Sequence, residues 1–143
     1  NCVYSSANDK IYCFGGAYFN FEKGQAQRVE KVIEYDPILD KLVERDSILP
    51  SPRRLLSCVD NSVNKKIYCF GGDDATTTYY DDIIEYDPLL DNLKVIAKLP
   101  APRSAMSCIE YNSAGIHCFG GIFYNSSTGE SIYSDQIVSF DYV

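Results

Sequence analysis

The feature that most constrains the fold is a hexapeptide that recurs three times. IYCFGG stands at residues 11–16 and again at 67–72, and IHCFGG stands at 116–121. The copies therefore begin 56 and 49 residues apart. Periods near fifty residues are typical of architectures in which similar units stack or radiate around an axis. A chain of 143 residues is ordinarily one domain, so the repeat indicates three successive units within it.

The similarity between the units extends beyond the hexapeptide. VIEYDPILDKL at 32–42 aligns with IIEYDPLLDNL at 83–93, and LPSPRR at 49–54 aligns with LPAPRS at 99–104. The third unit reaches IVSFDYV at 137–143. Several motifs that recur in the same order indicate a repeated structural unit far more specifically than a single glycine doublet does.

In the most complete copy, four short runs have the alternating, β-branched or aromatic character of strands. They span residues 55–60, 66–70, 82–86 and 92–99. A short polar turn joins the first two runs, and an Asp-Pro turn joins the last two. No long segment shows helical periodicity. The sequence therefore predicts an all-β fold made of four-stranded antiparallel sheets.

The paired glycines end the second strand of each unit, where the chain must leave the sheet. Glycine adopts positive φ at low cost and lets another backbone segment approach closely. A phosphate-binding loop is the alternative, but such a loop requires a helix N-terminus directly after it, and no helix is expected there. We therefore expect the glycines to have a structural role.

The repeated pattern resembles kelch repeats over essentially the whole chain. The resemblance is carried by a glycine doublet after a strand, a Tyr-Asp-Pro turn and a Pro-Arg segment. In the second unit these are Gly71-Gly72, Tyr86-Asp87-Pro88 and Pro102-Arg103, in the first Gly15-Gly16, Tyr35-Asp36-Pro37 and Pro52-Arg53, and in the third Gly120-Gly121 with Phe140-Asp141.

The resemblance implies kelch-type β-propeller blades, with the first strand of each blade lining a central channel and the fourth strand at the rim. The blade units would span residues 1–49, 55–99 and 105–143, the last one incomplete. Leu42 and Leu93 stand at the positions where kelch repeats carry Trp, and the chain has no Trp. We expect leucine to fill the same space between blades with less area.

A propeller closes with roughly four to eight blades, so these units form only a partial arc. An open arc exposes the apolar face of the blade at each end, and such faces mark interfaces or further chain. We favour further blades outside these residues, because the sequence begins and ends within a blade. The alternative is a homo-oligomer, for example a dimer that builds one six-bladed ring.

The cysteines form three pairs in register, namely Cys2 with Cys13, Cys58 with Cys69, and Cys108 with Cys118. One member of each pair lies on the first strand and the other directly opposite on the second. Opposite Cβ atoms lie about 4.5–5.5 Å apart and a disulfide needs roughly 3.5–4.5 Å, so cross-strand disulfides are feasible. The alternative is that cysteine serves as a small apolar residue of a buried strand. Zinc is disfavoured because its ligands cluster in one place.

Asn125 begins a glycosylation sequon, Asn125-Ser126-Ser127, in a predicted surface loop. A sequon arises often by chance, but together with paired cysteines it favours a secreted or cell-surface protein. A cytoplasmic location is the alternative.

Charge and hydropathy exclude two classes of partner. The net charge is −7 and the 13 basic residues are scattered, whereas nucleic-acid binding needs a clustered basic face. The apolar runs are too short to span a bilayer.

The chain has few residues suited to catalysis. Its single histidine, His117, replaces the tyrosines of the sister copies inside a strand, so packing is the favoured role. One kelch-like class of copper enzymes requires two histidines and does not fit. Four carboxylates, Asp73, Asp74, Asp81 and Asp82, could form a Ca²⁺ site or an acid/base pair, but we favour capping of strand ends. We therefore expect no catalytic residue, no metal and no cofactor.

The connections between the second and third strands span 17–31, 73–82 and 122–135, and they differ completely between units. Variable loops on a fixed scaffold are the usual place for recognition. The aromatic candidates for partner binding are Tyr18, Phe19, Tyr79, Tyr80, Phe123 and Tyr124. The kelch resemblance implies that these loops project from the same face as the links, so Arg53, Arg54 and Arg103 are expected nearby, where they would suit an acidic peptide or a glycan. The alternative is that Arg53 and Arg103, which match a kelch position often used for contacts between blades, have a structural role, which leaves Arg54 as the most independent candidate.

These observations favour a non-enzymatic binding module that presents variable aromatic loops to a protein or carbohydrate partner. The alternative is a structural component of an extracellular assembly or filament built from propeller arcs.

Overall fold

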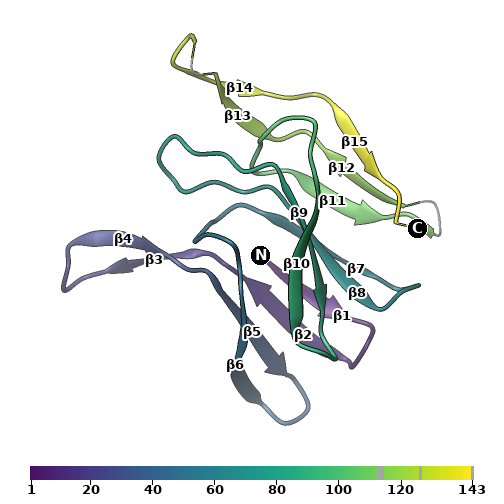
Figure 1. Cartoon of the computed structure of the whole chain (residues 1–143). Coiled ribbons are helices and arrows are strands. Elements are labelled where there is room, and N and C mark those ends of the chain that lie inside the picture. Colours follow the sequence, from purple (N-terminus) through teal and green to yellow (C-terminus); the bar gives the residue numbers. More distant parts are fainter. Residues whose placement is uncertain (113–114, 126, 143) are drawn as a thin grey trace.

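The computed structural model describes residues 1–112, 115–125 and 127–142, and the regular structure of these residues is entirely β (Figure 1). Three antiparallel sheets follow one another along the chain, and we call them blades 1, 2 and 3. Blade 1 contains, in spatial order, β1 (Cys2–Ser5), β2 (Lys10–Phe14), β5 (Lys31–Asp36) and β6 (Lys41–Ile48). Blade 2 contains β7 (Ser57–Asn61), β8 (Lys66–Phe70), β9 (Asp82–Asp87) and β10 (Asn92–Lys98). Blade 3 contains β11 (Ser107–Glu110), β12 (Ile116–Phe119) and β15 (Ile137–Phe140).

The predicted four-stranded antiparallel meander is confirmed. In blade 2 the four observed strands β7–β10 correspond to the four predicted runs, because alternating and β-branched segments bounded by turn residues determine strands locally. Blade 3 has three strands, as expected for an incomplete last unit.

Two connections predicted to be loops contain additional strands. β3 (Ala17–Asn20) pairs with β4 (Gln25–Arg28), and β13 (Ile122–Asn125) pairs with β14 (Glu130–Tyr133). Each pair forms a two-stranded sheet of its own. The prediction of loops was wrong here, because each of these strands has only four residues and the second strand of the first hairpin, QAQR, is polar and gives little strand signal. A glycine with positive φ, Gly24 at 63° and Gly129 at 74°, precedes each second strand, which is typical of hairpin turns.

Side-chain hydrogen bonds connect equivalent strands of successive blades. The backbone N–H of Cys58 on β7 donates to Oδ1 of Asn1 beside β1 at 3.2 Å, and that of Cys108 on β11 donates to Oγ of Ser57 on β7 at 3.0 Å. At the outer strands, the N–H of Asp46 on β6 donates to Oδ2 of Asp91 before β10 at 3.0 Å. First strands therefore lie beside first strands and fourth beside fourth, which is the radial order of propeller blades.

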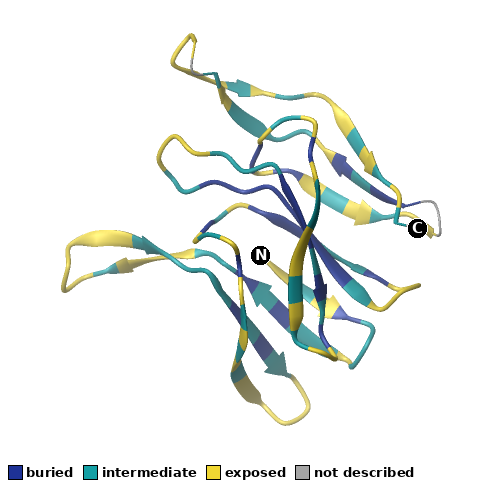
Figure 2. Ribbon diagram, in the orientation of Figure 1, coloured by how far each residue is buried: buried dark blue, intermediate teal, exposed yellow. Residues whose placement is uncertain are grey.

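The core lies between the faces of adjacent blades. Tyr86 of blade 2 packs against Tyr12 and Phe14 of blade 1, with ring centroids 5.4 and 5.3 Å apart. On the other face of blade 2, Tyr68 packs against Phe140 of blade 3 at 5.6 Å. Blade 2 is therefore covered on both faces, and Figure 2 shows the buried residues concentrated there.

The three cysteine pairs are disulfides, so of the two alternatives the bridged one is confirmed. Opposite cysteines are register partners on the first and second strands, with Cα atoms 4.0–4.1 Å apart. In blade 1 the neighbouring pair exchanges both backbone hydrogen bonds, from Asn1 N to Phe14 O and from Phe14 N to Asn1 O. The cysteines thus occupy the adjacent non-hydrogen-bonded site, where opposite strands come closest.

The glycine doublets allow the link between blades to pass directly over the end of the second strand. A Cβ added to Gly71 would lie 2.1 Å from the carbonyl oxygen of Arg103, and one added to Gly15 would lie 2.4 Å from that of Arg53. The N–H of Gly72 donates to the same Arg103 oxygen at 3.0 Å. The expected structural role of the doublets is therefore confirmed.

The faces at the two ends of the arc are open. Leu93 packs against the core between blades 1 and 2, but its counterpart Leu42 is 65% exposed on blade 1. Ile109, Phe119 and Ile137 are exposed on blade 3. Leu93 fills the space between blades 1 and 2, as expected. Leu42 is exposed because no blade lies against that face of blade 1 in the described residues.

Candidate functional site

Three structurally different connections leave the blades at one edge of the arc. They are hairpin β3–β4, residues 71–81 and hairpin β13–β14, and Figure 1 shows them extending in the same general direction. The links at 50–54 and 100–104 contact them through backbone hydrogen bonds, for example from Arg54 N to Asp73 O at 2.9 Å and from Ser104 N to Ile122 O at 2.9 Å. We call this edge the loop face.

Aromatic side chains are abundant on the loop face. Phe21 is 88% exposed and Tyr133 is 79% exposed, and Tyr18 and Phe19 are about half exposed. Phe19 and Phe21 contact each other edge to face, with centroids 5.1 Å apart. Among the predicted binding residues, Tyr124 is exposed, whereas Tyr79, Tyr80 and Phe123 have intermediate exposure.

Arg53 and Arg103 do not line an open mouth, so this part of the sequence-based prediction is wrong. Their exposed fractions are 0% and 1%. Arg53 donates to Oδ2 of Asp82 at 2.7 Å and to the carbonyl of Gly71 at 3.2 Å, with its guanidinium 4.0 Å from the centre of the Tyr80 ring. Each arginine side chain points inward from its link. There it hydrogen-bonds residues at the end of the neighbouring blade instead of contacting solvent.

Arg54 remains partly exposed on the loop face. Its Nε donates to Oδ1 of Asp73 at 2.9 Å, and the two residues also form a backbone bridge. The partner Asp73 is buried. Arg54 is therefore a tethered cation at the surface, and it is the one arginine of the three that a partner could reach.

The acidic residues considered for a metal or acid/base site form ion pairs and hydrogen bonds with neighbouring residues. Asp82 pairs with Arg53 and Lys98, and Asp81 pairs with Lys98. Asp74 accepts hydrogen bonds from the backbone of Thr76 and Thr78. Within the residues that the structure describes, no cluster of three or more potential metal ligands occurs.

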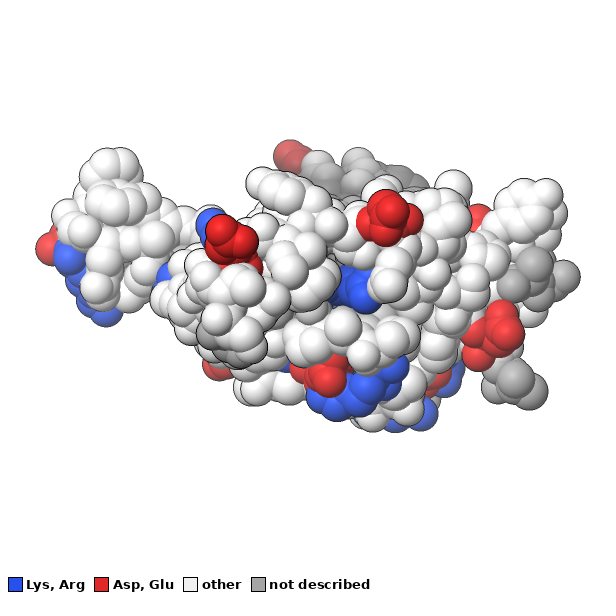
Figure 3. All heavy atoms as spheres, turned by 90° about the horizontal axis from the view of Figure 1, so that it is seen from above, with Lys and Arg blue, Asp and Glu red and all other residues white. Residues whose placement is uncertain are grey.

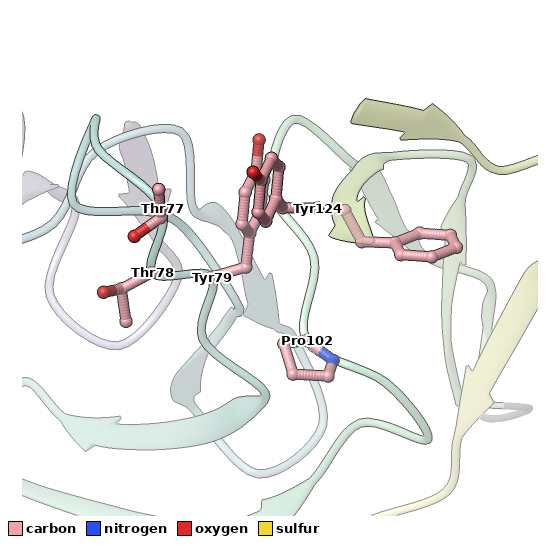
Figure 4. Close-up of a pocket in the computed structure, with 6 residues that line it drawn as sticks. Thr77, Thr78, Tyr79, Pro102 and Tyr124 are labelled. Atoms are coloured by element: carbon pink, nitrogen blue, oxygen red, sulfur yellow. The ribbon is translucent and has the colours of Figure 1, made fainter. Parts of the chain in front are cut away.

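A pocket of about 320 Å³ lies on the loop face between blades 2 and 3. It is lined by Thr77, Thr78, Tyr79, Pro102, Phe123 and Tyr124. In Figure 4 the phenol groups of Tyr79 and Tyr124 extend to the same side of the pocket, above Pro102. We call this the tyrosine pocket. None of its lining residues is charged.

Both walls of the tyrosine pocket are hydrogen-bonded to the link that carries Pro102. On one side, Arg103 N donates to Tyr80 O at 3.0 Å. On the other side, Ser104 and Ile122 exchange two backbone hydrogen bonds of 2.8 and 2.9 Å. The backbone around the pocket is therefore fixed by the same link that connects the blades.

Charged residues do not gather into one patch on the face seen in Figure 3, where acidic and basic side chains form small separate groups. This distribution agrees with the absence of a clustered basic face in the sequence. No helix among the described residues combines the length and hydrophobicity needed to cross a bilayer.

Sequence reasoning found Tyr79, Phe123 and Tyr124 but missed Thr77, Thr78 and Pro102. The threonines belong to the variable connection already singled out, and Pro102 belongs to the repeated link. Their position in one pocket depends on how blades 2 and 3 pack, which no local pattern indicates.

Comparison with known proteins agrees with this architecture. Residues 54–92 match the family model described as the Kelch motif. A solved structure reported as "Structure of YjhT", a kelch-type propeller, matches with a TM-score of 0.67 and 13% sequence identity, covering 93% of this chain and 49% of that chain. This chain thus spans about half the length of that protein, and at this identity the likeness shows the fold alone. No curated protein matches significantly.

Proposed function

Because this chain is built from kelch-type β-propeller blades, we propose that it is a non-enzymatic module that binds a protein partner through the loop face. A kelch propeller is typically a scaffold for protein interaction, but the fold alone does not define a function. The observation that carries the proposal is the set of exposed aromatic residues on connections that differ from blade to blade, with Phe21, Tyr124 and Tyr133 on the two hairpins. Aromatic side chains supply large contact areas and are enriched at the centres of interfaces.

A display selection tests the proposal. The chain would be immobilised and challenged with a library of random peptides, and saturable binders would be titrated against two variants. The loop-face variant carries Phe21→Ser, Tyr124→Ser and Tyr133→Ser. The control carries Ile38→Ser, Leu39→Ser and Leu90→Ser, which remove exposed apolar residues from the β5–β6 and β9–β10 turns.

We expect the loop-face variant to lose at least about tenfold in affinity, or 1.4 kcal/mol, with less than a twofold change in the control. A selection that yields no saturable binder, or binders that the two variants weaken equally, would overturn the proposal.

The disulfides support an extracellular or cell-surface location, since disulfides persist in oxidising compartments. Asn125, at the end of β13, begins the sequon, whose middle residue, Ser126, lies outside the described residues. We propose that Asn125 is glycosylated. An intact mass of the native protein under non-reducing conditions, with alkylation of free thiols, would report both features. A mass with six alkylated cysteines and no glycan would contradict them.

A second candidate is a structural component of an assembly, and the open faces of the arc favour it. Apolar residues such as Leu42 on blade 1 and Ile137 on blade 3 are exposed, and further blades or further copies would cover them. Sedimentation of the native protein distinguishes the two candidates. Concentration-dependent growth that Ile137→Ser abolishes would favour the assembly, and a fixed monomeric mass would exclude it.

A further inference from the structure

We propose that the tyrosine pocket binds a proline-rich segment in the polyproline II conformation that carries a basic residue beside the prolines. The inference rests on the proposed function, since it assigns the chemistry of a partner to one part of the loop face. Four properties of the pocket point to this ligand: its rings, its hydroxyl groups, the neighbouring charge and its fixed backbone.

The rings of the pocket suit a ligand of alternating apolar rings and carbonyl groups. Polyproline II helices dock into grooves lined by aromatic residues, because the ligand is already extended and loses little entropy on binding. Here Tyr79, Phe123 and Tyr124 surround Pro102 in a cavity of about 320 Å³. Flat aromatic faces of this kind pack well against pyrrolidine rings and bury apolar area at low conformational cost.

The hydroxyl groups of the pocket match the hydrogen-bonding capacity of proline-rich chains. A proline residue has a carbonyl acceptor but no N–H donor, so its partner must supply donors. The pocket offers the hydroxyls of Thr77, Thr78, Tyr79 and Tyr124. The Thr78 side chain already hydrogen-bonds the Asp74 carboxylate. Among residues 1–112, 115–125 and 127–142, no side-chain hydrogen bond engages the other three hydroxyls, those of Thr77, Tyr79 and Tyr124. They remain able to donate to the carbonyl groups of a bound segment.

The charge beside the pocket favours a basic flank. Asp74 accepts the N–H of the pocket residue Thr78 at 3.1 Å and forms no ion pair within the described part of the chain. Burial tends to raise its pKa, but hydrogen bonds from Thr76 and Thr78 outweigh this and lower the pKa of Asp74 to about 2. The carboxylate is therefore charged at neutral pH. Arg53 and Arg103 are buried, and the partly exposed Arg54 is already paired with Asp73. None of these three arginines is therefore both exposed and unpaired for an acidic peptide.

The backbone of the pocket is fixed before any ligand binds. The link at Pro102 is hydrogen-bonded through Arg103 to Tyr80 and through Ser104 to Ile122. A preformed site loses little conformational entropy on binding, which is the condition under which a stiff polyproline II ligand gains most.

The test is a titration followed by fluorescence anisotropy at low ionic strength. The probe is a labelled decaproline peptide with two lysines at one end. The comparison probes are decaproline with two glutamates, a glycine-serine peptide with two lysines, and maltotriose as a neutral sugar competitor. We expect the lysine-ended decaproline to bind saturably, at least about tenfold more tightly than the glycine-serine peptide.

Variants locate the site. Tyr79→Ala and Tyr124→Ala should each weaken binding of the lysine-ended decaproline about tenfold, which is the scale of an interface hot spot. Tyr133→Ala, on the same hairpin but outside the pocket, should change it less than twofold. Tyr124 is exposed, so its truncation leaves the core intact and keeps the test decisive if Tyr79→Ala lowers stability. Asp74→Asn should remove the preference for lysine over glutamate while decaproline still binds.

Several outcomes would overturn the inference. These are equal binding of decaproline and the glycine-serine peptide, insensitivity to Tyr124→Ala, and competition by maltotriose without any binding of decaproline. Peptides from the display selection that bind through the loop face while decaproline does not would reject this inference alone. Failure of both experiments would reject the proposed function as well.

Discussion

Arg53 and Asp82 form a buried ion pair that joins the link after blade 1 to the start of β9, with Nη2 and Oδ2 2.7 Å apart. One blade later, Arg103 occupies the same place in the repeat and is equally buried. Its Nη2 donates to Oε1 of Gln136 at 3.2 Å, and its Nη1 donates to Oγ of Ser134 at 3.3 Å. The guanidinium at this repeat position therefore donates hydrogen bonds to a carboxylate of blade 2 in one case and to neutral side chains of the third unit in the other.

Asp82→Asn tests how much the buried Arg53–Asp82 ion pair contributes to the free energy of unfolding. Burial tends to raise the pKa of Asp82, but hydrogen bonds from Lys98 and Arg53 and their charges outweigh it, so the pKa lies below its usual value. Removing one charge of a buried pair leaves the other uncompensated and costs on the order of 3 kcal/mol. Urea denaturation should show this loss, whereas Asp81→Asn, whose pair with Lys98 is largely exposed, should cost less than about 1 kcal/mol. Equal losses in the two variants would argue against the buried pair as a stabilising contact.

Gln136→Glu tests the opposite change, in which the neutral hydrogen-bond acceptor of Arg103 is replaced by a carboxylate. The substitution keeps the shape of the side chain and supplies the carboxylate that Arg103 lacks. A hydrogen bond to a charged group contributes more than a neutral one, but Gln136 is exposed, so we expect a gain of only about 1 kcal/mol in unfolding free energy. Gln25→Glu, at an exposed position of β4, controls for the added negative charge. A stability no higher than that of the control variant would contradict the expectation.

Glu34 should make the arc sensitive to acid. Its carboxylate is buried, pairs with Lys10, and accepts hydrogen bonds from Tyr12 at 3.0 Å and Arg45 at 2.8 Å. Burial raises the pKa of Glu34, but these contacts outweigh burial and lower it below 4.5. A lowered folded-state pKa means that this stabilisation is complete above about pH 4.5 and is lost as the pH falls through the folded value.

The measurement for Glu34 is the unfolding free energy between pH 7 and pH 2. Glu34→Gln should lower stability at pH 7 and flatten the loss below pH 4.5. Glu44→Gln, which removes an exposed pair with Lys31, should leave the acid limb of the curve unchanged. Parallel pH curves for the native chain and Glu34→Gln would show that Glu34 does not carry the acid dependence.

The disulfides should differ in their resistance to reduction because they differ in burial. Cys58 and Cys69 of blade 2 are both buried, whereas Cys2 of blade 1 is exposed. Thiol–disulfide exchange requires access of the attacking thiolate to a sulfur atom. Limited treatment with dithiothreitol, alkylation and peptide mapping should find Cys2–Cys13 reduced first. Prior reduction of Cys58–Cys69 would mean that blade 2 opens more readily than its packing indicates.

The sequence predicts the blades well because their signals are local. Alternation, turn residues and the glycine doublets determine the strands of each unit without reference to its neighbours. The binding face is less predictable because it depends on contacts between distant residues. The inward rotation of Arg53 follows from Asp82, which lies 29 residues away, and the tyrosine pocket combines Tyr79, Pro102 and Tyr124 from three separate segments.

Gly71→Ala tests the close approach on which the arrangement of the blades depends. Gly71 has φ of 62°, and an added Cβ would lie 2.1 Å from the Arg103 carbonyl oxygen, so the link must move away from the blade. Gly24 in the β3–β4 turn has nearly the same φ, 63°, but no atom within 4 Å of the added Cβ. Gly24→Ala therefore isolates the backbone cost, about 1–2 kcal/mol, whereas Gly71→Ala carries the steric clash in addition.

We expect Gly24→Ala to fold with a modestly lowered denaturation midpoint, and Gly71→Ala to lose several kcal/mol or to fail to fold. Because the clash displaces the link that also fixes Pro102, near-ultraviolet circular dichroism should report altered packing of the tyrosines in Gly71→Ala at temperatures where it remains folded. Similar midpoints for the two variants would mean that the doublet is needed for its backbone conformation alone, and that the blades do not depend on close contact with the link.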